Sequence, residues 1–229
     1  MQLFKKYCLL LLMLVMVAQA QQSAFDLYQA ASKGDRQAFA QLKALGNKGN
    51  DSAQWNLGTM YHFGEGVPKD SVQAVFWYQK SADRGNASAQ WCLGGMYENG
   101  EGVPKNSVQA VFWYRKSANQ GDETGQMALG SMYANGTGVP KDSEMAVFWY
   151  RKSAEQGNDQ GQYLLGVMYA NGIGVPTDLV MAYMWVNLAA APGVLDENAK
   201  KMRGLLEKGM TPAQIAKAQK MSREWRPKP

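Results

Sequence analysis

Histidine and cysteine are scarce in this sequence. Its 229 residues include one His, His62, and two Cys, Cys8 and Cys92. A single His excludes every catalytic or metal site that needs two. Because Cys8 lies in a segment that we expect to be removed on export, the mature chain has no second cysteine for a disulfide or a cysteine-rich zinc site. We therefore expect no disulfides and no bound metal.

The common catalytic motifs are missing as well. No Ser is followed three residues later by Lys, and neither G-x-S-x-G nor G-x-x-x-x-G-K-[ST] occurs. A G-x-G-V-P stretch recurs, but it falls between predicted helices rather than after a strand, so it indicates no phosphate-binding loop. The sequence thus predicts a protein that is not an enzyme and has no cofactor.

The N-terminus has the pattern of an export signal. Lys5 and Lys6 precede an apolar run over residues 7–18 that is too short to span a bilayer. The run ends in Ala18-Gln19-Ala20, which matches the A-x-A signature of signal peptidase. We expect residues 1–20 to be a cleaved signal peptide and the mature protein to be periplasmic or secreted.

The remaining charge is unevenly distributed. Residues 21–193 carry 13 basic and 15 acidic side chains, whereas residues 194–229 carry nine and four. Such a basic tail is suited to contact with a membrane surface or the cell wall, although a solvated helix face explains it as well. Export argues against nucleic acid as a partner.

A 36-residue repeat fills the middle of the chain. It is marked by a tryptophan and a glycine in each unit, and the units run over 50–85, 86–121, 122–157 and 158–193. The recurring residues are Trp77, Trp113, Trp149 and Trp185, with Gly58, Gly94, Gly130 and Gly166.

Each unit is predicted to form two helices joined by a turn. In the first unit Asn50 is a candidate N-cap, and Gly64 ends the first helix by taking a left-handed conformation. Asp70 begins the second helix, where Gln73 is placed to complete a capping box, and Gly85 closes it. No stretch alternates with a period of two, so no strand is indicated.

The second helix of the unit carries two apolar stripes. One contains Ala74, Trp77 and Ala82, and the other contains Val72 and Phe76. Since one hairpin cannot bury both stripes, we expect neighbouring units to stack and cover them. This predicts an all-α protein, an α/α superhelical solenoid of stacked helix-turn-helix repeats.

These units resemble Sel-one-like repeats (SLR), relatives of the tetratricopeptide repeat. The resemblance rests on the pattern Ala53-x-x-x-Leu57-Gly58-x-x-Tyr61-x-x-Gly64-x-Gly66-Val67-Pro68-x-Asp70, which recurs in register over residues 50–193. Residues 21–49 resemble a truncated N-terminal repeat. Residues 194–229, with Thr211-Pro212-Ala213-Gln214, resemble a C-terminal helical cap. The resemblance implies an adaptor or scaffold in protein complexes, including envelope and host-contact roles in bacteria.

One face of the predicted first helix varies between the repeats, while the rest of the helix is largely constant. In tetratricopeptide-like stacking the first helices line the concave groove, so this face is the candidate binding surface. The polar and small positions are expected to be exposed, whereas the large residues at the first position fit either the core or the groove. The candidate residues are Trp55, Thr59, His62, Trp91, Gly95, Glu98, Met127, Ser131, Ala134, Tyr163, Val167 and Ala170.

Two functions from different classes fit these observations. The first is a non-catalytic protein–protein interaction scaffold of the cell envelope, or a secreted one, that binds a peptide or helix of a partner in its groove. The alternative is a cell-wall-associated or carbohydrate-active protein that acts on or binds peptidoglycan, since abundant aromatic side chains can stack on sugar rings.

Overall fold

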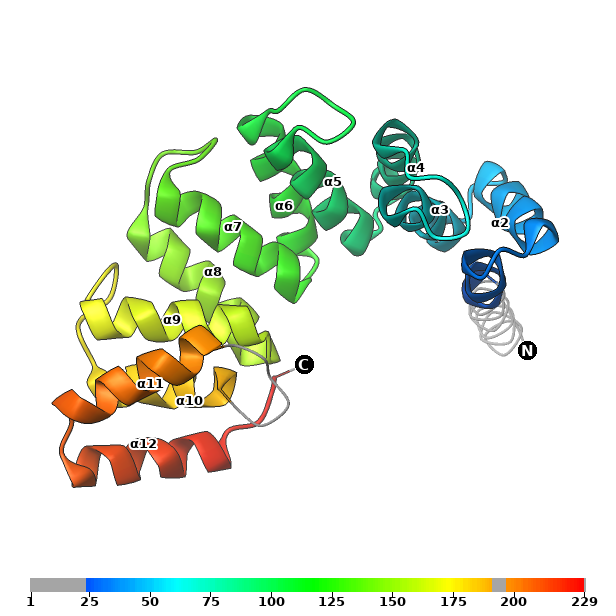
Figure 1. Cartoon of the computed structure of the whole chain (residues 1–229). Coiled ribbons are helices and arrows are strands. Elements are labelled where there is room, and N and C mark those ends of the chain that lie inside the picture. Colours follow the sequence, from blue (N-terminus) through cyan, green and yellow to red (C-terminus); the bar gives the residue numbers. More distant parts are fainter. Residues whose placement is uncertain (1–23, 191–196, 229) are drawn as a thin grey trace, which may run out of the picture. The chain divides into compact units, whose positions relative to one another are not determined.

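The computed structural model describes residues 24–190 and 197–228, and this part of the chain is helical throughout, with no strand. Residues 24–32 form a first helical segment, and eleven helices follow (Figure 1). Their bounds are α2 Arg36–Asn47, α3 Asp51–Phe63, α4 Ser71–Asp83, α5 Ala87–Asn99, α6 Ser107–Asn119, α7 Glu123–Asn135, α8 Ser143–Gln156, α9 Asp159–Asn171, α10 Leu179–Ala189, α11 Glu197–Gly209 and α12 Pro212–Glu224. The proposed signal peptide lies outside the described residues.

The helices belong to two compact units, Met1–Asn106 and Ser107–Pro229. In the first unit α3 packs on α4, and α4 packs on α5; in the second, α7 packs on α8 and α9 on α10. Each helical hairpin therefore packs against the hairpin that follows it in the sequence, as in a solenoid. The unit boundary falls between α5 and α6, inside the second 36-residue repeat. None of the helices described is long and apolar enough to cross a membrane.

The helices of the first repeat begin and end at the predicted capping residues, with one exception. Asn50 caps α3 by accepting the Ala53 N–H at 2.7 Å, and Gly64 ends that helix with φ of 76°. Asp70 caps α4, but the capping box expected with Gln73 does not form. The backbone N–H that a capping box would use donates instead to the Tyr61 carbonyl at 2.8 Å, which ties the start of α4 to the end of α3.

The second glycine of each G-x-G-V-P turn makes a close contact between repeats. Gly102 has φ of 71°, and a Cβ added there would overlap the carbonyl of Ser71 at the start of α4. An added Cβ would overlap the preceding backbone in the same way at three other glycines: at Gly66 with Ala31, at Gly138 with Ser107 and at Gly174 with Ser143. Since only glycine has both the backbone freedom and the missing side chain, this turn allows one repeat to lie directly on the backbone of the repeat before it.

A buried glutamine joins each first helix to the helix before it. The Gln90 side chain is 3 % exposed, and its Nε2 donates to the Ala82 carbonyl at 3.0 Å, near the end of α4. The same bond recurs at 2.8–3.3 Å from Gln54 to Gly46, Gln126 to Ala118 and Gln162 to Ala154. These donors satisfy carbonyls near helix C-termini, where intrahelical partners run out.

The tryptophan stripe is core, as predicted. Trp77 is 2 % exposed and packs with Leu42, Leu57 and Met60 in the core of the first unit, and the other three recurring tryptophans are also buried. Gly58 lies against the ring of Tyr78, where any Cβ would collide.

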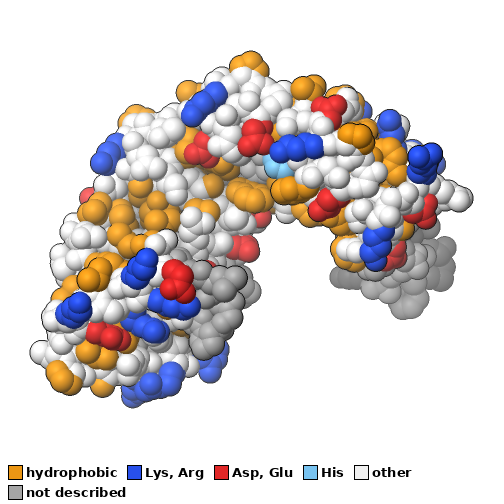
Figure 2. All heavy atoms as spheres, viewed as in Figure 1, with side chains coloured by type: hydrophobic (Ala, Val, Ile, Leu, Met, Phe, Trp, Pro, Cys, Tyr) orange, Lys and Arg blue, Asp and Glu red, His pale blue; other side chains and the backbone are white. Residues whose placement is uncertain are grey.

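The prediction that the second stripe is buried was wrong in part. The stripe also contains Val75, which is half-buried, and its counterparts Val111 and Val147 are buried. Val72 and Phe76 are exposed, and so are Val108, Phe112 and Phe148 in the second unit. The neighbouring repeat reaches the start of the second helix through its turn glycine but does not cover the exposed side chains. Lysine side chains cover part of this exposed surface, because the Lys80 ammonium lies 4.5 Å from the Phe76 ring centroid. Hydrophobic side chains accordingly break the polar surface in many small patches (Figure 2).

The first helical segment is attached to the first repeat by polar contacts. Buried Asn56 donates from Nδ2 to the Ala24 carbonyl at 3.2 Å, and the Tyr28 hydroxyl donates to Glu65 Oε2 at 2.6 Å. Glu65, in the first G-x-G-V-P turn, is half-buried and accepts the bond from this hydroxyl.

This tyrosine predicts a pH dependence of stability. Burial, followed by the hydrogen bond and the charge of Glu65, raises the pKa of Tyr28 from 10.0 to about 12. A raised folded-state pKa gives stability that is complete below pH 10 and is lost as the pH rises through 12. Solvent screening at this partly exposed site reduces the effect to about 1 kcal/mol. Urea unfolding at pH 8 and pH 11 should show a smaller fall in stability for Tyr28→Phe than for the unchanged protein. Equal falls would contradict this origin.

Candidate binding surface

In the first unit the variable face is half-open to solvent. Trp55, Thr59 and His62 on α3 are half-buried, as are Gly95 and Glu98 on α5. Trp91 on α5 is 37 % exposed. None of these six residues is fully buried, so the large residues at the first position of the face are not simply core. Trp91 is the most open of them.

The hydroxyl at the second position of this face has an internal role. Thr59 Oγ1 donates to the Trp55 carbonyl and accepts a bond of 3.3 Å from the Tyr78 hydroxyl. Burial raises the pKa of Tyr78, and Cys92 beside it raises it further. Cys92 is half-buried next to this hydroxyl, and the described part of the chain contains no disulfide. The Thr59 hydroxyl is thus used in hydrogen bonds within the protein and has little hydrogen-bonding capacity left for a partner.

His62 is less exposed than its variable position suggests. Its ring lies 4.5 Å from that of Phe63 and 6.3 Å from that of Tyr78, centroid to centroid. Its Nδ1 is shielded from solvent and has no hydrogen-bond partner among the described residues. The expectation of an exposed side chain was therefore wrong, because Tyr78 of the following helix leans over this face.

The second unit carries the same face with different neighbours. Ser131 Oγ accepts from the Tyr150 hydroxyl at 3.1 Å, repeating the Thr59 arrangement, and lies 3.8 Å from Met127 Sδ. Ala134 packs against the core cluster around Trp185. All six candidate residues here are half-buried, namely Met127, Ser131, Ala134, Tyr163, Val167 and Ala170.

The C-terminal cap covers part of this face. Tyr163 and Ala170 pack against the cluster formed by α10, α11 and α12. Within the cap, Thr211 and Gln214 form the expected capping box, and Ser222 Oγ donates to the Met184 carbonyl at 3.2 Å. The face is therefore most open in the first unit.

Sequence reasoning missed the tyrosine–hydroxyl pairs. A signal was present, because Tyr follows Thr59 and Ser131 by 19 residues, whereas Val186 follows Val167 at that spacing. The signal is partial, because Tyr114 follows Gly95 at the same spacing and Gly95 has no hydroxyl. Among the described residues, no three His, Cys, Asp or Glu side chains gather closely enough to hold a metal ion.

The four repeats match a known protein family. The Sel1 repeat family profile matches residues 51–86, 87–122, 124–158 and 159–193. None of the curated proteins matches the chain.

Solved structures agree with the family match. A protective antigen of uropathogenic Escherichia coli, c5321, which displays an SLR fold, is 32 % identical with a TM-score of 0.81; the match covers 90 % of this chain and 45 % of the antigen. This chain thus spans about half of that relative's length. A Sel1 repeat protein from Oxalobacter formigenes is also 32 % identical, with a TM-score of 0.73 and coverage of 90 % and 85 %.

A more distant structure supports the fold alone. The immunity protein Pa5087 of Pseudomonas aeruginosa is 18 % identical, with a TM-score of 0.52 and coverage of 88 % and 83 %. Sel1 repeats generally form scaffolds for protein–protein interaction and are typically non-catalytic. Four matched repeats and two structures at 32 % identity establish that this chain belongs to the Sel1 repeat family.

Proposed function

We propose that this protein is a non-catalytic adaptor of the cell envelope or the exterior that binds a segment of a protein partner on the variable face of its first helices. The observation that carries the proposal is Trp91, a residue more than one third exposed on a face whose residues differ between repeats. A stacked fold has no need of an exposed tryptophan there. Tryptophan is enriched among the residues that dominate binding energy at protein interfaces.

The face around Trp91 also offers mixed chemistry. Glu98 lies two turns further along α5, and Trp55 and His62 lie on α3. An aromatic centre with a polar border is typical of a docking site for a peptide or an amphipathic helix. Export of the protein, proposed from Lys5, Lys6 and Ala18-Gln19-Ala20, would place its partners outside the cytoplasm.

The test compares one tryptophan with a matched exposed residue. The tagged chain would capture partners from an envelope extract, and a captured protein would then be titrated directly. We expect Trp91→Ala to weaken binding at least tenfold, because central aromatic residues typically contribute 2 kcal/mol or more. Val72→Ser, which changes an exposed apolar residue on α4, should leave binding unchanged. Both variants should melt within a few degrees of the unchanged protein.

Two results would contradict the proposal. Capture that is equal for Trp91→Ala and Val72→Ser would move the binding surface elsewhere. Co-sedimentation with peptidoglycan that depends on Trp91, without a protein partner, would favour the cell-wall alternative.

A further inference from the structure

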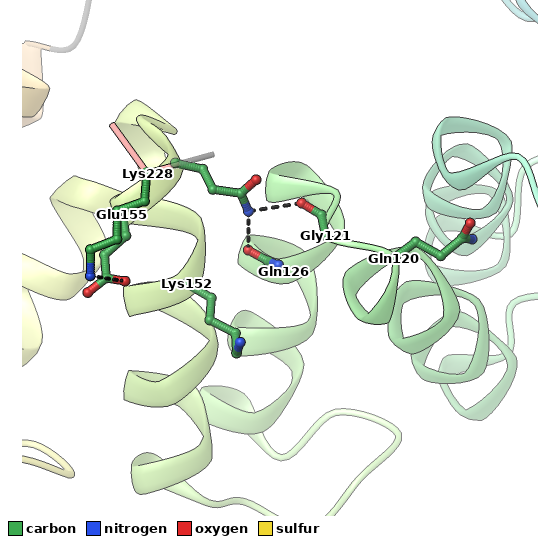
Figure 3. Close-up of a pocket in the computed structure, with 7 residues that line it drawn as sticks. Gln120, Gly121, Gln126, Lys152, Glu155 and Lys228 are labelled. Atoms are coloured by element: carbon green, nitrogen blue, oxygen red, sulfur yellow. Dashed lines mark hydrogen bonds and ion pairs between the residues drawn. The ribbon is translucent and has the colours of Figure 1, made fainter. Parts of the chain in front are cut away.

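After α12 the chain becomes extended and returns to the end of α8. Trp225 ends α12 with φ of −63° and ψ of 143°, and residues 225–228 follow as a segment that we name the C-terminal strap. The Lys228 backbone N–H donates to the Glu155 carbonyl at 2.7 Å. Its ammonium lies 3.0 Å from Glu155 Oε2, and Figure 3 shows the two side chains meeting. The strap is thus held at its end by one backbone bond and one ion pair.

The start of the strap is held by an aromatic contact. The Trp225 ring lies 6.1 Å from that of Trp185 at an interplanar angle of 73°, and it packs half-buried against the core cluster of α8 to α10. Trp225 and Pro227 both lie about 3.8 Å from where a Cβ of Gly157 would be. The equivalent glycines of earlier repeats, Gly85 and Gly121, have open space at that point.

The surface continues beyond the strap. A cleft of about 460 Å³ begins at Lys228 and Glu155 and reaches Gly121, the counterpart of Gly157 one repeat earlier. Gln156 Nε2 donates to the Gly121 carbonyl and to Gln126 Oε1 at the far side, and Lys152 also lines the cleft. In Figure 3, Gly121 and Gln126 lie across the cleft from Lys228. A longer extended segment would therefore find contacts that the strap does not use.

The ion pair at the end of the strap is open to solvent. The side chains of its ion pair are 66 % and 30 % exposed, for Lys228 and Glu155. Exposed ion pairs of this kind contribute little to stability. Its binding elements are nevertheless those of peptide recognition: an aromatic anchor, a backbone hydrogen bond and an acidic side chain opposite a lysine.

From these contacts we propose that Glu155, Gly157 and Trp185, together with the adjoining cleft, form a docking site for an extended segment of a partner protein that carries an aromatic residue, then Pro and Lys two and three positions later. The C-terminal strap is the internal competitor for this site. Glu155 selects the lysine, the flat glycine surface accepts the proline, and Trp185 meets the aromatic ring. This site lies on α8 to α10 and does not depend on the Trp91 face.

The test uses two variants that break the same ion pair from opposite sides. The probe is a fluorescent peptide with the sequence of residues 222–229, Ser-Arg-Glu-Trp-Arg-Pro-Lys-Pro, titrated against the whole protein by anisotropy. Both variants also carry Trp225→Ala, so that neither side-chain anchor of the strap remains. Lys228→Glu then leaves the site intact and should bind the peptide at least fivefold more tightly than the unchanged protein. Glu155→Lys also frees the strap but removes the acidic partner, so it should lose binding. Lys220→Glu, the same charge change in an exposed pair on α12, should bind as the unchanged protein does.

A charge-swapped peptide sharpens the result. Replacing its Lys with Glu should abolish binding to Lys228→Glu and restore it to Glu155→Lys. Peptide binding that is the same for both variants would overturn the proposal and leave the strap as a cover for the end of the repeats. Self-association of Lys228→Glu in light scattering, without peptide binding, would also overturn it, because the occupant would then be a second copy of the chain.

Discussion

Gly102→Ala should lower the free energy of unfolding by about 2–5 kcal/mol. The residue has φ of 71°, which costs an alanine roughly 1–2 kcal/mol, and its new Cβ would overlap the Ser71 carbonyl of the preceding repeat. Because that obstacle is backbone, the two repeats must move apart, which adds about 1–3 kcal/mol as overpacking does elsewhere. Urea unfolding followed by circular dichroism measures the loss.

Gly85→Ala is the matched control for this substitution. Gly85 also has a left-handed backbone, with φ of 96°, but a Cβ there meets nothing within 4 Å. Gly85→Ala should therefore lower the free energy of unfolding by only the backbone cost of roughly 1–2 kcal/mol. Equal losses for the two variants would show that the turn glycine serves conformation alone and not the approach of repeats.

Trp77→Ala should cost about 3–5 kcal/mol, the range for removing a large aromatic side chain from a core. Trp77 is 2 % exposed, contacts the Phe76 ring edge-on at 5.1 Å, and lies against Gly46 of α2. The cavity would open between two helices of the first unit. Thermal and urea unfolding both report on this loss.

The indole N–H adds a second readout at this position. Trp77 Nε1 is buried without a hydrogen-bond partner among the described residues. Trp77→Phe removes this unsatisfied donor, which costs roughly 1–3 kcal/mol where it stands, so it should be much milder than its loss of volume suggests. Phe76→Ala on the exposed side of the same pair should cost about 1 kcal/mol or less. A Trp77→Ala variant as stable as Phe76→Ala would contradict the core assignment.

The sequence predicts the elements of this fold because their signals are local. Asn50 and Gly64 bracket a helix within a span of a few turns, and Trp77 recurs at a fixed spacing in every unit. Whether Val72 and Phe76 are buried or exposed depends instead on contacts between repeats. A helix has two apolar stripes in the sequence, but only the geometry of stacking decides which one a neighbour covers.

The candidate surface was harder to predict for the same reason. Thr59 and His62 were predicted to be exposed from their polarity and variability, yet Tyr78, on the next helix, bonds to one and covers the other. Their neighbours are 16 to 19 residues away in sequence, beyond any helical periodicity. Trp91, the most open residue of this face, looked the same in sequence as Trp55.

The buried glutamines make the array extendable. Each one donates to a carbonyl supplied by the helix immediately before it, and each repeat offers the same carbonyl to the next. A duplicated repeat therefore arrives with its own donor and leaves behind an acceptor for its successor, so none of these backbone carbonyls loses its partner. Gain or loss of 36 residues in one genetic event preserves every such bond, whereas an insertion of a few residues within a helix rotates the glutamine away from its acceptor. We therefore expect a chain lengthened or shortened by one whole repeat to keep the same pattern of buried hydrogen bonds between helices.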